Sequence, residues 1–111
     1  MNSEILEVRL GGEKIGHLAR TKNGARFAFS EEVASAHPSS PLLSTALCVQ
    51  EEPFDAQRTF SWFSGLLPED ARLDELQRFY GVAEGDYFGL LAQIGWECAG
   101  AVEVMPSEDW A

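Results

Sequence analysis

The stretch Thr59-Phe60-Ser61-Trp62-Phe63-Ser64-Gly65-Leu66-Leu67-Pro68-Glu69-Asp70 combines three aromatic side chains and two adjacent leucines, and its apolar part stops at a proline. On a helix, Phe60, Phe63 and Leu67 fall on one apolar stripe, because they are three and four residues apart. Pro68 lacks a backbone N–H and disfavours helical geometry at the residue before it. The sequence therefore predicts a helix that ends near Leu67.

A second amphipathic segment follows the proline. Glu69 and Asp70 open it, and a glycine, Gly81, is placed to end it as the C′ residue. Its apolar residues share one face at helical spacing: Leu73, Leu76, Phe79 and Tyr80. The two segments together predict a helix–proline–helix corner with a dense apolar inside.

Trp62 lies away from the stripe of the first helix. At about 100° per residue it is roughly 160° from Phe60. One interpretation is that its ring belongs partly to the core. The other, which we adopt as the expectation, is a substantially exposed ring that anchors a partner, because tryptophan is favoured at binding hot spots. Glu69 and Asp70 would then supply acidic contacts at the rim of the interface.

The first part of the chain predicts three strands in series. They are expected over Ile5–Leu10, Glu13–Thr21 and Ala25–Ser30; the alternation of apolar residues is imperfect in the first and regular in the third. Gly11-Gly12 and the Lys22-Asn23-Gly24 turn separate them, and both are typical of tight hairpin turns. Three strands joined in this way form an antiparallel meander.

Later elements are expected to be short. Ser30 is placed to cap a helix with acidic residues in its first turn, and Asp86 to cap a helix over Tyr87–Ile94. Alternating apolar residues predict a fourth strand over Leu43–Val49 and a last strand over Ala101–Met105. The expected architecture is α+β: a small, mostly antiparallel sheet with about three helices packed on one face. Residues 1–111 are expected to form a single domain.

The charge of the chain is uneven. The formal net charge is −10, with five basic and three acidic side chains in residues 1–30, and three basic and fifteen acidic in residues 31–111. Such acidity repels phosphate backbones and argues against direct nucleic-acid binding. It suits a basic protein partner, or it serves only to keep a small domain in solution.

No catalytic constellation emerges from the sequence. His17 lies within a predicted strand, where a surface position is expected, and His37 lies in a loop with no neighbouring nucleophile pattern. The acidic pairs fall at predicted helix starts or in loops, where such residues are common: Glu31-Glu32, Glu51-Glu52 and Glu69-Asp70. We therefore expect no enzyme activity, no catalytic residue and no cofactor.

Metal binding, secretion and membrane insertion are not expected either. Cys48 and Cys98 belong to no CxxC or His-containing ligand set, and they are expected to be reduced thiols of a cytoplasmic protein. The first residues do not form a basic signal-peptide region, and no apolar run approaches the length of about 18 residues that a membrane span needs.

Two motifs resemble the N-terminal subdomain of HipA-like serine/threonine kinases. Residues 63–72, FSGLLPEDAR, are similar to its "F..NLLPEG..R" motif, and residues 86–102, DYFGLLAQIGWECAGAV, to its "D.FGLLA.IG.DCAGAV" motif. Residues 15–18, residues 26–29 and Pro106 match shorter segments of the same subdomain. The departures are Gly65 in place of Asn, Asp70 in place of Gly and Glu97 in place of Asp.

The resemblance implies a role in protein binding. In the full-length kinases this subdomain precedes the ATP-binding and catalytic parts and carries no catalytic residue. A HipS-type antitoxin is similar to the subdomain alone and neutralises a shortened HipA-like kinase toxin, HipT, with a HipB-like DNA-binding protein in the same HipBST complex. The chain resembles such an antitoxin. The alternative implied by the same resemblance is the non-catalytic N-terminal domain of a full-length HipA-like kinase.

Overall fold

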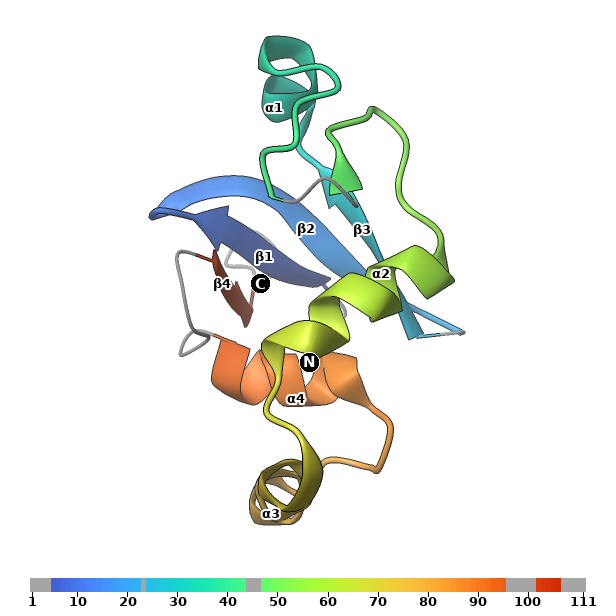
Figure 1. Ribbon diagram of the computed structural model, residues 1–111, viewed down its shortest axis with the longest axis vertical. Helices are drawn as coiled ribbons and strands as arrows, with labels where there is room; N and C mark the ends of the chain where they lie inside the picture. The colour runs from blue at the N-terminus through green and yellow to red at the C-terminus, as the bar shows by residue number, and fades with distance from the viewer. Residues whose placement is uncertain (1–4, 23, 44–46, 96–101, 107–111) are drawn as a thin grey trace.

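A computed structural model describes residues 5–22, 24–43, 47–95 and 102–106 of the chain. Within them, four antiparallel strands form one sheet in the order β3-β2-β1-β4. The strands are β1 (Ile5–Leu10), β2 (Glu13–Thr21), β3 (Gly24–Phe29) and β4 (Val102–Pro106). The predicted meander is thus confirmed, and the last strand pairs with the first, so that β1 lies inside the sheet (Figure 1).

The first hairpin forms at the double glycine that the sequence marks. Gly11 has φ of 60° and Gly12 has φ of 89°, a left-handed backbone that glycine adopts without strain. The turn places Leu10 opposite Glu13, and the register shifts by one residue between Val8 and Arg9. Beyond this irregularity Leu6 lies opposite Leu18 and Val8 opposite Gly16. The second predicted turn includes Asn23, which lies outside the described residues.

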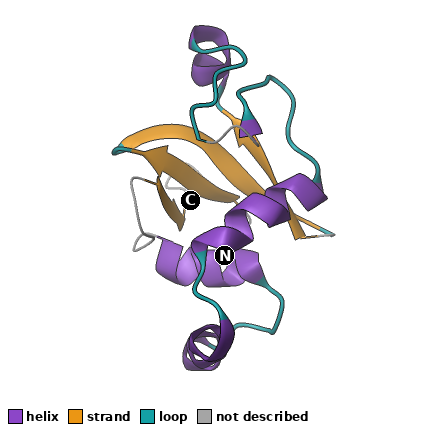
Figure 2. Ribbon diagram, viewed as in Figure 1, coloured by secondary structure: helices purple, strands orange, loops and turns teal. Residues whose placement is uncertain are grey.

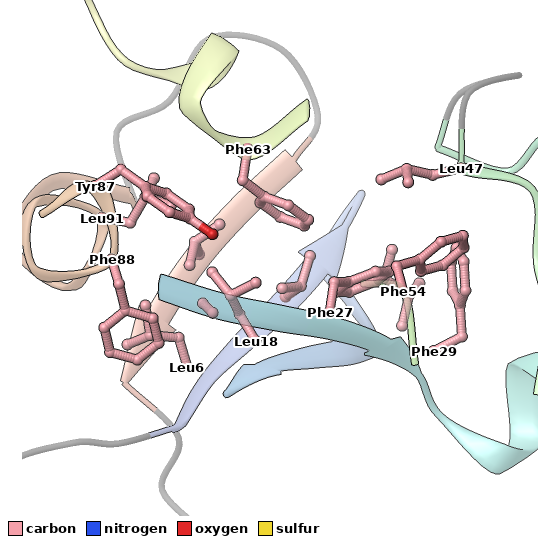
Figure 3. Packing of buried hydrophobic residues seen from close by; sticks show 14 of the residues in the cluster. Leu6, Leu18, Phe27, Phe29, Leu47, Phe54, Phe63, Tyr87, Phe88 and Leu91 are labelled. Atoms are coloured by element: carbon pink, nitrogen blue, oxygen red, sulfur yellow. The ribbon is translucent and has the colours of Figure 1, made fainter. Parts of the chain in front are cut away.

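One face of the sheet carries the core. The cross-strand partners Leu6, Leu18 and Phe27 are fully buried on this face, and so are Val8 and its β4 partner, Val104. Figure 3 shows Leu6, Leu18 and Phe27 together with aromatic side chains from the helices. Phe27 is the centre of the aromatic group, with ring centroids 5.1 Å from Phe63 and 6.1 Å from Phe54.

Among the described residues, the helical elements that pack with the sheet or extend from it are α1 (Glu31–Ala36), α2 (Ala56–Phe63), the 3-10 turn η2 (Ser64–Leu66), α3 (Asp70–Tyr80) and α4 (Tyr87–Ile94) (Figure 2). Ser30 caps α1 and Asp86 caps α4, as the sequence predicts. Gly81 ends α3 in the left-handed conformation, with φ of 69°. Helices α2 and α4 pack on the core face, which confirms the predicted α+β class, while α3 projects from the end of the molecule (Figure 1).

The predicted strand over Leu43–Val49 is wrong for the residues that the structure describes there. Leu47 and Val49 are buried, but they contribute to the core from a loop. Instead of a strand, the loop that leads into α2 covers the outer edge of β3, where the Phe54 N–H donates to the Phe27 carbonyl. The alternation of apolar residues therefore reflected two inward-pointing side chains in a loop.

The helix–proline–helix corner forms, but the set of side chains buried in it differs from the predicted one. Regular α-helix stops at Phe63, a 3-10 turn follows, and Leu67 adopts an extended backbone before Pro68. Phe60 and Phe79, both assigned to the apolar inside by their spacing, are 51% and 80% exposed. The corner thus leaves two large apolar side chains on the surface.

Candidate functional site

The orientation of α2 determines which of its aromatic residues are available to a partner. Thr59 and Phe63, four residues apart, are both completely buried and face the sheet. At about 100° per residue, Phe60 and Trp62 lie on opposite flanks of this buried line, each roughly 80° from it. The helix therefore presents one aromatic side chain on each of two surfaces.

Trp62 is less exposed than the sequence predicted. Its side chain is partly buried against the core, and its ring meets Phe63 edge-on at a centroid distance of 4.9 Å. It borders a hollow of about 250 Å³ that Leu47, Arg58 and Ser61 also line. Leu47 lies beside this flank of α2, which a helical wheel of the segment alone does not reveal.

Phe60 lies on the other flank, beside a larger cleft. The ring of Phe60 stands edge-on to Tyr87 at 5.3 Å. The cleft, about 500 Å³, lies between the end of α2, α3 and the segment that leads into α4. Leu67 and Leu73 are among its apolar lining residues.

The three predicted partner-binding residues do not share one hollow. Glu69 is the exposed N-cap of α3 and lines the 500 Å³ cleft, whereas Trp62 borders the smaller hollow. Asp70 begins α3, and its side chain lies outside the described part of the structure. Phe60, which the sequence assigned to the core, lines the same cleft as Glu69. Its exposure follows from the burial of Thr59 and Phe63, which the apolar pattern did not indicate.

The motif that begins at Asp86 holds α4 on the sheet. An Asp86 carboxylate oxygen accepts the Gly89 backbone N–H at 3.0 Å and an N–H of Arg20 at 3.2 Å. The Arg20 guanidinium also lies over the Phe88 ring, 4.5 Å from its centroid. A Cβ added at Gly95 would lie 2.4 Å from the Val104 carbonyl oxygen, so glycine lets the end of α4 approach β4. These motif residues act as scaffold.

The histidines lie in two different elements. His17 is in β2 opposite Glu7, and burial, with a smaller contribution from Lys14, lowers its pKa from the ordinary value of 6.5. His37 is exposed at the end of α1. In the described part of the chain, no three His, Cys, Asp or Glu side chains are grouped to hold a metal ion. No helix found there has the length and apolar character to cross a membrane.

The fold, the two motifs and a family comparison agree. Residues 6–105 match the family model described as the HipA N-terminal domain. The chain belongs to the HipA N-terminal domain family. This match includes both the helix–proline–helix corner and the scaffold around Asp86.

Two similar proteins are much longer than this chain. Putative kinase Y4mE of Sinorhizobium fredii is 30% identical over 97% of this chain and 26% of its own length. The serine/threonine-protein kinase toxin HipA of Shewanella oneidensis is 32% identical over 91% of this chain and 23% of its own length. The chain thus spans about a quarter of these relatives.

Two solved structures have the same fold. One is HipA of Shewanella oneidensis MR-1 in a complex with HipB and its operator DNA; the TM-score is 0.69 at 27% identity, over 93% of this chain and 24% of that chain. The other is described as the N-terminal domain of HipA toxin, with a TM-score of 0.67 at 24% identity, over 97% of this chain and 96% of that chain. The second likeness establishes the fold alone.

Proposed function

We propose that this chain is a cytoplasmic antitoxin of the HipBST type that binds and neutralises a shortened HipA-like serine/threonine kinase toxin, HipT. A HipB-like protein supplies DNA binding in the complex. The observation that carries the proposal is the family match over residues 6–105, together with relatives that include a HipA kinase toxin. The chain takes the place of the N-terminal subdomain that the shortened kinase lacks.

Binding is the function that the surface supports best. The sequence contains no HRD or DFG cluster and no P-loop, which are the parts that hold and transfer a phosphoryl group in kinases and NTPases. The described surface instead carries partly buried Trp62 and exposed Phe60 at the end of α2. A kinase that covers the end of α2 and η2 reaches Trp62 on one flank, and Glu69 and Asp70 on the other.

Co-expression tests the antitoxin function directly. The kinase encoded beside this chain is induced alone and with the chain, while growth is followed, and the pair is purified through a tag on the kinase. Relief of growth arrest together with co-purification is expected. Unchanged arrest and no co-purification would contradict the proposal.

The second candidate function is the non-catalytic N-terminal domain of a longer HipA-like kinase, where it supports the kinase fold. The observation in its favour is that the curated relatives are about four times as long as this chain. The genomic reading frame distinguishes the two functions. A frame that continues into kinase motifs supports the structural role, and a separate downstream kinase gene supports the antitoxin.

A further inference from the structure

The 500 Å³ cleft beside Phe60 combines an apolar floor with an acidic rim. Phe60, Leu67, Leu73 and Tyr87 contribute apolar surface from both sides of the corner. Phe60 is 51% exposed, so about half of this aromatic side chain is available for contact. Large apolar side chains that remain exposed beside a concavity are typical of binding surfaces.

In the part of the chain that the structure describes, the charged residues that line this cleft are all acidic. Glu69, Asp74 and Glu84 lie on its rim, two from α3 or its cap and one from the loop before α4. All three are exposed. Close acidic side chains of this kind produce a negative potential that attracts positive groups and repels acidic ones.

Helix α3, which forms one wall, has little other support. Gln77 is its most buried residue at 9% exposure, and it too lines the cleft. Figure 1 shows α3 at the end of the molecule, away from the sheet. A segment seated in the cleft would contact α3, η2 and the residues before α4 together, and so would bury apolar surface on each.

We propose that this cleft is a docking site for a basic segment of a partner protein, in which lysine or arginine residues flank an aliphatic or aromatic side chain. The apolar side chain lies against Phe60 and Leu73. The flanking cations pair with the rim carboxylates of Glu69, Asp74 and Glu84. Charge complementarity selects this occupant, because an acidic segment would bring like charges together at the rim.

The cleft lies on the opposite flank of α2 from Trp62. The site shares Glu69 with the proposed kinase contact and goes beyond it in Phe60, Leu73, Asp74 and Glu84. Its failure would leave the anchoring role of Trp62 untouched.

The probe is a synthetic peptide, acetyl-Lys-Arg-Leu-Phe-Lys-Arg-amide, titrated into the full-length chain at physiological salt. Nitrogen–proton NMR spectra are expected to show the largest shift changes at Gly65, Leu73 and Gly85, which line the cleft. Two companion peptides are expected to bind at least about tenfold more weakly: one with Ser-Ser in place of Leu-Phe, and one with glutamates in place of the cations. Absent binding, or shift changes spread evenly over the surface, would overturn the proposal.

A matched pair of triple variants distinguishes the effect of the rim carboxylates on peptide binding from the effect of the overall negative charge. E69Q/D74N/E84Q is expected to raise the peptide dissociation constant about tenfold, because it removes three partly solvated charge pairs. E31Q/E32Q/E51Q removes the same charge from exposed positions on α1 and its following loop region, and is expected to change the constant less than about twofold. Equal effects of the two triples would overturn the proposal.

Two single variants test whether the peptide binds in this cleft. Gly65→Phe adds a ring where a Cβ meets no atom within 4 Å, at the cleft wall, and is expected to block the peptide. Trp62→Ala is expected to leave peptide binding unchanged. Loss of binding in Trp62→Ala with no effect of Gly65→Phe would place the peptide on the wrong flank and refute the site.

Discussion

Thr59 accepts a hydrogen bond from the backbone N–H of Phe27 at 3.1 Å, and both residues are completely buried. Phe27 lies on the edge strand β3, opposite Leu18 of β2. At this position the backbone N–H and carbonyl of Phe27 point away from β2, toward the open edge of the sheet. The Phe54 N–H meets the Phe27 carbonyl on the same edge. A side chain and a loop thus satisfy the edge groups that would otherwise invite another strand.

We predict that Thr59→Val destabilises the domain by about 1–3 kcal/mol, because it keeps the size of the side chain but leaves the buried Phe27 N–H without a partner. Thr59→Ser retains the hydroxyl and is expected to lose less. Urea unfolding of both variants measures the difference. Equal stability of Thr59→Val and the parent chain would contradict this role of the hydroxyl.

We predict that Gly95→Ala costs about 1–3 kcal/mol or more of stability, because the new Cβ would lie 2.4 Å from the Val104 carbonyl oxygen and 2.7 Å from the Val104 Cβ. Gly65→Ala is the control, since a Cβ there meets no atom within 4 Å. Thermal unfolding is expected to separate the two alanine variants. Similar melting temperatures would show that α4 and β4 can move apart without loss.

We predict that Asp86→Ala lowers stability by about 1 kcal/mol or more, through loss of the cap on the Gly89 N–H. Asp86→Asn retains an oxygen that can accept this bond and removes only the exposed pairing with Arg20, which is worth about 0.2–1 kcal/mol. Chemical unfolding at two salt concentrations distinguishes these contributions. Salt is expected to reduce the difference between Asp86→Asn and the parent chain.

His17 makes the stability depend on pH in one direction. Burial, and then Lys14, lowers the pKa of His17 in the folded chain, so the unfolded chain, with the ordinary value of 6.5, binds more protons below that pH. Stability is therefore complete above about pH 6.5 and falls as the pH drops toward the folded pKa. We predict that His17→Gln weakens this dependence between pH 7 and 5.5, as measured by urea unfolding. His37→Gln, at an exposed position, is the control and is expected to leave it in place.

We predict that Trp62→Ala weakens the complex with the kinase about thirtyfold, which corresponds to a loss of about 2 kcal/mol. Because Trp62 is partly buried against Phe63, the free domain is also expected to lose about 1–2 kcal/mol of stability. Titration against the kinase and thermal unfolding of the free variant are measured together. A stability loss with unchanged affinity would mean that Trp62 serves only the core.

The sequence correctly predicted those elements whose geometry depends on residues adjacent in sequence. Gly11-Gly12 marked a turn that needs positive φ, and Asp86 marked the start of α4. The exposure of Phe60 and the partial burial of Trp62 were not predictable in this way. Thr59 bonds to the edge of β3, so that Thr59 and Phe63 form the buried face of α2. The apolar pattern treats Thr59 as a polar residue. In the structure its hydroxyl is buried and accepts a hydrogen bond from Phe27, which is 32 positions earlier in the sequence.

The candidate surfaces were predictable only in part. The sequence marked α2 and Glu69 as parts of a partner surface, which remains a prediction, but it could not place Trp62 and Glu69 on different flanks. That separation depends on where the Leu47 loop and Tyr87 lie beside α2. Both come from segments distant in sequence, so a helical wheel contains no information about them.

The pairing of β1 with β4 imposes an order on folding during synthesis. Leu6 and Pro106 are opposite each other in the sheet, so the sheet cannot close until nearly all of the described chain has left the ribosome. Until then β1 is itself an edge, with backbone groups open to other nascent chains. Under the proposed antitoxin function, a kinase that recognises the folded domain could bind it only after β4 has been translated, so the time needed to reach β4 would set the earliest moment at which neutralisation begins.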